Sequence, residues 1–178
     1  FQTFPWEPQV HLGLFVHRVD DLPKGLYFLV RNKNHLEDLK STLSDHFKWE
    51  KPEGCPKELD LFLLEEYNCQ RMAAGVSCGQ EIAGAGCFSL GMISAFEAPL
   101  NQIGPWVYPR LYWECGAIGQ VLYLQAEVSG IRSTGIGCFF DDSVHHIFGI
   151  KDLKYQSLYH FTVGGPVEDH RLTTLPPY

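Results

Sequence analysis

The chain has 178 residues, enough to bury one sizeable hydrophobic core and too few for two ordinary domains. Its 21 acidic residues outnumber the 14 basic ones, and the net charge of −7 argues against a protein that binds nucleic acid or an anionic membrane. No apolar run approaches the roughly 18 residues of a membrane span. We expect one domain over residues 1–178. Because the sequence begins at Phe1 rather than Met, we expect that domain to belong to a longer chain.

The cysteines show neither a CxxC pair nor regular spacing; they are Cys55, Cys69, Cys78, Cys87, Cys115 and Cys138. Disulfide frameworks are typical of short, cysteine-dense secreted chains, and this chain is neither. We therefore expect reduced thiols in an intracellular, cytoplasmic setting, although an even number of cysteines also permits bridges.

The N-terminal part predicts a hairpin. Residues 10–17 alternate between apolar and polar side chains, residues 20–25 carry turn-forming Asp, Pro and Gly, and residues 26–30 return as a second strand. Asn34 with Glu37 three positions later resembles a capping box. It predicts a short helix to about residue 47, and a third strand follows over residues 59–64.

The middle of the chain is almost uncharged. Between Met72 and Trp113 the only charged residues are Glu81, Glu97 and Arg110. The pattern predicts a helix over residues 77–96 that is apolar on nearly every side, and such a helix is buried or lies in an interface. Its glycines lower the helix propensity, which close approach of a neighbouring backbone would explain.

A second long helix is predicted over residues 108–129, with Pro109 at its start and Gly130 at its stop. Its apolar stripe comprises Leu111, Cys115, Ile118, Leu122 and Ala126, and Arg110 is placed to pair with Glu114. A glycine-punctuated strand over 134–140, a short helix over 141–149 and a last strand over 157–163 follow. Short strands around two long buried helices predict an α+β domain.

Two features have both a catalytic and a packing interpretation. Adjacent His145 and His146 suggest metal binding, but neighbours on a helix point about 100° apart, whereas ligand pairs take i,i+4 spacing. Cys78, at the start of the first predicted helix, suggests a thiol of lowered pKa, yet no Cys/His nucleophile signature accompanies it. Packing is the stronger interpretation of both.

Two further features suggest a ligand. The segment Gly135-Ile136-Gly137 has the permissive backbone of a loop that contacts a cofactor, and a structural bulge explains it about as well. Arg171 follows a Gly-Gly-Pro turn and could bind a phosphate or a carboxylate; a salt bridge to Glu168 or Asp169 is the alternative.

The run from Glu114 to Glu127, ECGAIGQVLYLQAE, resembles the central-helix signature of the nitroreductase-like flavoprotein superfamily. The glycine-rich segment, the Asp141-Asp142 helix start and the turn at 162–166 follow in the order typical of that family. The hairpin segment LPKGLY at residues 22–27 resembles the SagB-type dehydrogenase branch, some of whose members carry two such halves in one chain.

This resemblance implies a nitroreductase-like fold and an FMN enzyme that transfers hydride through flavin N5, with NAD(P)H as donor and a small molecule as acceptor. The flavin would lie in a groove between two subunits of a homodimer or between two halves. In such an enzyme the cofactor carries the chemistry, and the protein orients it. Residues expected against the isoalloxazine, with a backbone N–H on N5, are Ser133, Thr134, Gly135, Ile136 and Gly137. Arg171 matches the cation that holds the flavin phosphate, while Glu114 and Gln120 match structural positions.

Two family elements are missing. Residues 1–30 contain neither the R-x-S-x-R-like phosphate-binding stretch nor the Pro-Ser segment that follows it. Residues 105–108, Pro-Trp-Val-Tyr, replace the Lys-Tyr pair of azoline-oxidising enzymes, so azoline oxidation is not expected. The alternative hypothesis is a degenerate half that binds no cofactor and serves as the structural partner of an active half.

Overall fold

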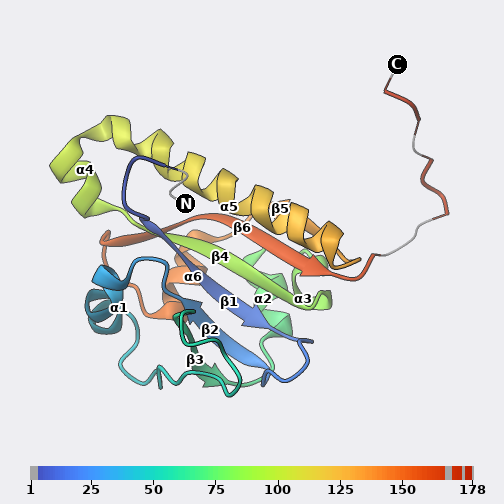
Figure 1. The fold of residues 1–178 in the computed structure, drawn as a ribbon, viewed down its shortest axis with the longest axis horizontal. Coiled ribbons are helices and arrows are strands. Elements are labelled where there is room, and N and C mark those ends of the chain that lie inside the picture. The colour runs from blue at the N-terminus through green and yellow to red at the C-terminus, as the bar shows by residue number, and fades with distance from the viewer. Residues whose placement is uncertain (1–3, 167–169, 174, 178) are drawn as a thin grey trace.

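The computed structural model describes residues 4–166, 170–173 and 175–177, and within them the chain forms one six-stranded sheet (Figure 1). The strand order is β3-β2-β1-β4-β6-β5, and every neighbouring pair is antiparallel. The strands are β1 (Val10–Val16), β2 (Gly25–Leu29), β3 (Leu61–Glu66), β4 (Phe88–Ala95), β5 (Arg132–Ile136) and β6 (Tyr155–Gly164).

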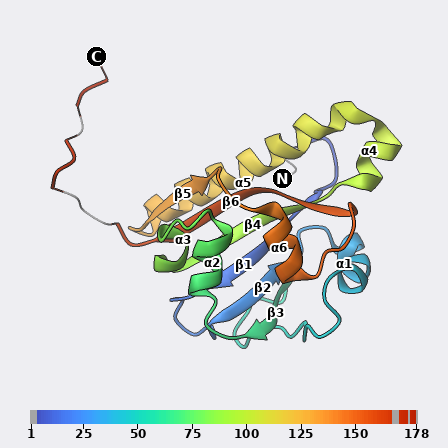
Figure 2. The ribbon, with the colours of Figure 1, turned by 180° about the vertical axis from the view of Figure 1, so that it is seen from behind.

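Helices cover both faces of the sheet, which makes the α+β prediction correct. The helices are α1 (Leu36–Thr42), α2 (Gln70–Val76), α3 (Ile82–Ala85), α4 (Glu97–Ile103), α5 (Tyr108–Val128) and α6 (Asp141–Phe148), with 3-10 turns at Lys33–His35 and Pro105–Val107. The long helix α5 packs on one face, and α1, α2, α3 and α6 pack on the other (Figure 2). No helix in the described part of the chain is long and apolar enough to cross a membrane.

The predicted hairpin is confirmed as β1 and β2, and the predicted second long helix is confirmed as α5. Gly130 ends α5 with a φ of 69°, a left-handed conformation that glycine adopts without strain. Gly149 ends α6 in the same way, with a φ of 78°. Local signals therefore located these elements correctly.

The predicted helix over residues 77–96 is wrong. Only the four residues of α3 are helical there, and Phe88–Ala95 forms β4 at the centre of the sheet. Since β4 lies between β1 and β6 and is covered on both faces, seven of its eight residues are buried, and no polar alternation marks it as a strand. Gly91 does allow a neighbour to approach the backbone closely, because an added Cβ would lie 3.1 Å from Nε2 of His160.

The predicted capping box is also wrong, because the cap lies two residues earlier. The Asn32 side chain accepts the N–H of Asn34 at 3.1 Å and begins the 3-10 turn, and α1 starts only at Leu36. The last predicted strands are confirmed with shifted bounds, β5 ending at Ile136 and β6 beginning at Tyr155. The helices α2 and α4 were not predicted.

The expectation of six reduced thiols is wrong for two of them. Cys78 and Cys138 form a disulfide with 5.9 Å between their Cα atoms, so Cys78 is not a free thiol nucleophile. The remaining cysteines are free, and two of them, Cys69 and Cys115, are buried.

Buried histidines add a pH-sensitive element to the core. His11 is fully buried, and its Nδ1 accepts the N–H of Arg31 at 3.2 Å. Its proton must therefore sit on Nε2, which donates to Nδ1 of His35 at 3.0 Å. Burial is the main cause that lowers the pKa of His11 to about 3, and burial lowers the pKa of His160 to about 4.

We predict that the protein loses stability in mild acid because of these histidines. Their folded pKa values lie below the unfolded value of 6.5, so their contribution is complete above about pH 6.5 and is lost as the pH falls towards 4 and 3. Each should lower the free energy of unfolding by about 1.4 kcal/mol per pH unit in that window. Urea unfolding at several pH values measures this slope.

His11→Asn should reduce the slope, and His46→Asn, at an exposed surface position, should leave it unchanged. Equal slopes for the parent and His11→Asn would contradict the prediction.

Candidate functional site

The residues expected against a flavin lie together at one edge of the sheet. Ser133–Ile136 belong to β5, and Gly137 follows it. β5 is the last strand in the sheet order and pairs only with β6, so its outer side carries backbone groups that the sheet does not satisfy. The turn at Gly130 connects α5 to this edge. In that turn the N–H of Ile131 donates to the carbonyl of Ala126 at 3.0 Å.

The two glycines of this segment have different surroundings. The N–H of Gly135 donates to the hydroxyl of Tyr123 at 2.9 Å, and an added Cβ would lie 2.2 Å from the hydroxyl of Tyr159. A side chain at this position would require Tyr159 to move. At Gly137 an added Cβ would meet nothing within 4 Å, and its N–H has no hydrogen-bond partner among the described residues. Gly137, rather than Gly135, therefore offers a free donor.

A cavity of about 430 Å³ borders the start of this segment. Its walls are Arg132, Ser133 and Thr134 of β5, the turn Gly164–Pro166, Thr162, and Ile82, Ala85 and Gly86 around α3. The Ser133 hydroxyl is buried without a partner among the described residues, an arrangement that costs free energy unless a ligand or water satisfies it. Because Ser133 pairs with Val163 of the apolar cluster under α5, this hydroxyl lies on the α5 side of β5 and not in the cavity beside α3. The volume is within the range of small-molecule sites.

These groups fit one face of a flavin. An isoalloxazine carries polar atoms along its edge, which suits an unpaired hydroxyl and an unpaired backbone N–H. Glycines let the ring approach the main chain closely. The chain thus holds groups that could bind the ring, whereas its phosphate would need cations.

Arg171 is not brought to these residues. It is exposed and belongs to the C-terminal tail, which runs away from the sheet in both views (Figures 1 and 2). Its alternative partners, Glu168 and Asp169, lie outside the described residues. Two other cations lie beside the cavity: Arg132, which also pairs with Glu127 at 3.2 Å, and Arg18, whose guanidinium donates to the carbonyl of Gly86 at 3.1 Å.

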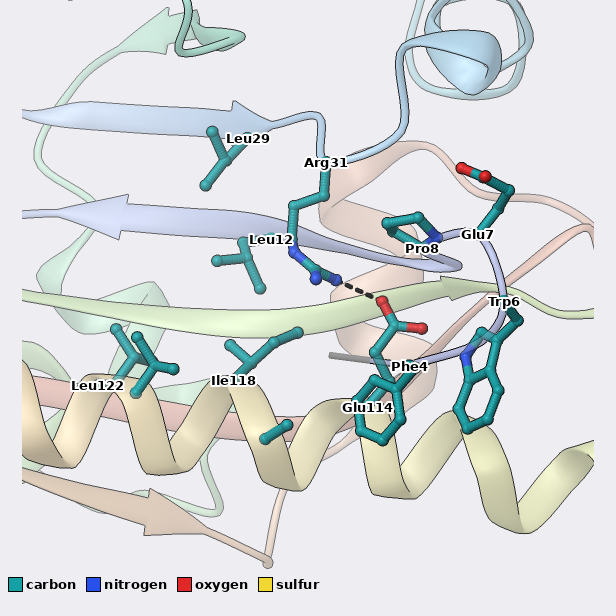
Figure 3. A pocket seen from close by; sticks show the side chains of 12 residues that line it. Phe4, Trp6, Glu7, Pro8, Leu12, Leu29, Arg31, Glu114, Ile118 and Leu122 are labelled. Atoms are coloured by element: carbon teal, nitrogen blue, oxygen red, sulfur yellow. Dashed lines mark hydrogen bonds and ion pairs between the residues drawn. The ribbon is translucent and has the colours of Figure 1, made fainter. Parts of the chain in front are cut away.

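A larger cavity, of about 660 Å³, lies on the other side of α5 (Figure 3). Segment 4–8, β1, β2 and α5 form its walls, which are mostly apolar, including Leu12, Leu29 and Ile118. Arg31 reaches from the end of β2 towards Glu114 on α5 across this space. Sequence reasoning missed Arg31, since nothing near it in the chain marks its partner.

Glu114 is almost completely buried and is bonded on both carboxylate oxygens. It accepts the backbone N–H groups of Gln9 at 3.1 Å and Val10 at 3.2 Å, and it pairs with the Arg31 guanidinium. The predicted pair between Arg110 and Glu114 is therefore wrong. The Arg110 guanidinium instead lies over the rings of Trp106 and Trp6, at 4.0 and 5.1 Å from their centroids.

Of the adjacent histidines, His145 takes part in the contact between α6 and β6. Nε2 of His145 accepts the N–H of Ser157 at 3.0 Å, and burial lowers the pKa of its imidazole. No group of three or more His, Cys, Asp or Glu side chains that could hold a metal occurs within the described part of the chain.

Solved structures share the fold of this chain. A protein of Anabaena variabilis classed as a nitroreductase matches 89% of this chain with a TM-score of 0.67 and 22% identity. One of the same class from Ralstonia eutropha matches 92% with a TM-score of 0.58 and 13% identity. The chain has the nitroreductase fold. The E. coli microcin synthetase McbBCD complex, solved with truncated pro-MccB17 bound, shares this fold over 90% of the chain, with a TM-score of 0.61 and 17% identity.

This chain spans only part of the length of those proteins. The chain covers 27% of the Anabaena protein, 60% of the Ralstonia protein and 53% of the matched McbBCD chain. The sequence matches no protein-family model, and comparison with curated proteins gives no match. The fold is therefore established by structure rather than by sequence similarity.

We predict that Arg31→Met lowers the free energy of unfolding by about 3–5 kcal/mol, since it leaves the buried Glu114 carboxylate without its countercharge. Arg132→Met is the matched control, because the Arg132–Glu127 pair is exposed on both sides and should contribute below about 1 kcal/mol. Chemical denaturation of both variants measures the difference. Equal losses would contradict the structural role of Glu114.

Proposed function

We propose that this chain is an FMN-dependent oxidoreductase domain that transfers hydride between NAD(P)H and an acceptor, working with a second copy or a second nitroreductase-like half. The observation that carries the proposal is the edge of β5, where the Ser133 hydroxyl and, at the other end of the segment, the Gly137 N–H lack partners among the described residues. The nitroreductase fold supports the same placement.

Bound FMN would supply hydride transfer at its N5 atom. This chain's own groups would orient the ring: the Gly137 N–H would donate to it and the Ser133 hydroxyl would bond its polar edge, whereas the space beside Gly135 is taken by the Tyr159 hydroxyl. The Tyr123 hydroxyl accepts the Gly135 N–H and so would hold β5 in place beside the ring. Arg132 beside the cavity could pair with the phosphate, and a partner would supply the further groups that hold it.

One observation favours the alternative, a cofactor-free half that acts as a structural partner. The Gly135 N–H, in the middle of the segment expected to face the ring, is already bonded to Tyr123 within the chain. A strand that satisfies its own donor needs no cofactor at that position. Flavin binding decides between the two.

We predict that the native protein shows oxidised-flavin absorption, or acquires it with added FMN, and that NADH or NADPH bleaches the bands. Ser133→Ala should weaken FMN binding about 5- to 10-fold through the lost hydrogen bond. The same change should not lower the stability of the flavin-free protein, because it removes a buried hydroxyl that has no partner.

Thr42→Val is the matched control. The Thr42 hydroxyl is also buried without a partner, but it lies on α1, away from β5, so this variant should leave FMN affinity unchanged. A protein that binds no FMN would favour the cofactor-free half, whereas equal affinities of Ser133→Ala and the parent would contradict the role of Ser133.

The partner surface that we propose is the outer side of α5. Trp113, Val121, Leu124 and Val128 are 56–81% exposed and recur at helical spacing on the side turned away from the sheet. Contiguous apolar surface of this kind marks an interaction site. Its occupant would be the same helix of a second copy, or of a second half with this fold.

We predict that the chain self-associates and that Leu124→Glu weakens the association at least about tenfold, because the charge would be buried in an apolar interface. Leu153→Glu is the matched control, since Leu153 is similarly exposed but lies in the loop before β6. Sedimentation equilibrium measures both. A chain that stays monomeric, or equal effects of both variants, would contradict a homodimer through α5.

A further inference from the structure

The Cys78–Cys138 disulfide joins two turns that meet beside the end of β5. Cys78 follows α2, and Cys138 lies directly after Gly137, between β5 and α6. The two residues are 60 positions apart in the chain, so the fold alone brings them together.

Hydrogen bonds hold the two turns in place independently of the sulfur–sulfur bond. The N–H of Phe140 donates to the carbonyl of Val76 at 2.8 Å. The Gln80 side-chain amide donates to the carbonyls of Ser77 at 2.9 Å and Cys138 at 3.1 Å, so it bridges both turns. Reduction of the disulfide would therefore leave two thiols facing each other, ready to be oxidised again.

The backbone also fixes Cys78. Its φ of 56° is left-handed, in the position after a helix end where glycine is usual, and the N–H of Gly79 donates to the carbonyl of Ala74 at 2.9 Å. A non-glycine residue in this conformation is strained. The direction of the Cys78 side chain is thus set by the end of α2.

Reagents can reach the pair. Cys138 is exposed and Cys78 is half-buried. An added Cβ at the flanking glycines, Gly79 or Gly137, would meet nothing within 4 Å, so there is open space beside both cysteines. Exposed disulfides are the ones that exchange with external thiols.

The two buried cysteines are poor candidates for exchange with external thiols. Cys69 and Cys115 are inaccessible, and burial raises the pKa of Cys69 to about 11 and that of Cys115 to about 12. Both thiols therefore stay protonated and unreactive at neutral pH. Cys55 and Cys87 are half-buried and free, so an experiment must remove them.

We propose that Cys78 and Cys138 form a redox-active pair that exchanges electrons with external dithiols while the protein stays folded. A thiolate of the dithiol attacks Sγ of Cys138, the disulfide breaks, and Cys78 leaves as a thiolate that takes up a proton. The second thiol of the dithiol attacks the mixed disulfide. Two electrons pass to this chain, both cysteines end as thiols, and the external dithiol becomes a disulfide.

Reduction has a structural consequence for the neighbouring site. Residues 137–140 lose their covalent link to the turn after α2 and keep only the Phe140 and Gln80 hydrogen bonds. The Gly137 N–H would then be less fixed. Its effect on a flavin rests on the proposed function, whereas the redox reaction itself does not.

The test uses the full chain in a Cys55→Ser/Cys87→Ser background, treated with millimolar dithiothreitol or reduced glutathione without denaturant. We expect maleimide labelling to appear on Cys78 and Cys138, located by peptide mass spectrometry. Circular dichroism should stay unchanged, and oxidised glutathione should restore the disulfide. Hydrogen exchange of residues 137–140 should rise about tenfold on reduction, while β4 and β6 stay protected.

Adding Cys78→Ser/Cys138→Ser to that background is the control, and this variant should show no response to either reagent. A pair that becomes reducible only in denaturant would overturn the proposal and make the disulfide purely structural. Loss of circular dichroism on native reduction would also overturn it. Absence of flavin binding would leave these readouts intact, so failure of the proposed function is distinguishable from failure of this proposal.

Discussion

The buried carboxylate of Glu114 determines how the long helix sits on the sheet. It is bonded to the backbone at the start of β1 and to Arg31 at the end of β2, so one side chain ties α5 to two adjacent strands. A buried charge is tolerated only when its hydrogen bonds are made, and here both oxygens are engaged. This requirement sets the register of α5 against the sheet.

The candidate flavin edge depends on that register. The turn at Gly130 leads from α5 directly into β5, and Tyr123, about two and a half turns along the helix from Glu114, bonds the backbone of Gly135. A shift of α5 along the sheet would move both the start of β5 and the Tyr123 hydroxyl that bonds it. The ion pair therefore positions the site without taking part in it.

The helix α5 is apolar on two opposite sides for two different reasons. Leu111, Cys115 and Ala126 are buried against the sheet, whereas Trp113, Leu124 and Val128 point away from it. The inner stripe supplies the core of this chain. The outer stripe is exposed apolar surface of the kind that is typical of an interaction site.

The sequence by itself determined the elements whose signals are local: the hairpin, α5 with its stop at Gly130, and α6 with its stop at Gly149. It misplaced β4, because a central strand buried on both faces loses the alternation that distinguishes it from a buried helix. Only the tertiary structure decided that Glu114 pairs with Arg31, 83 positions away, and that Cys78 meets Cys138. Partners so distant in the chain leave no local pattern, since their approach is set by packing and by the need to satisfy buried groups. The same reason explains why the unpaired Ser133 hydroxyl and the open side of Gly137 became visible only in the folded protein.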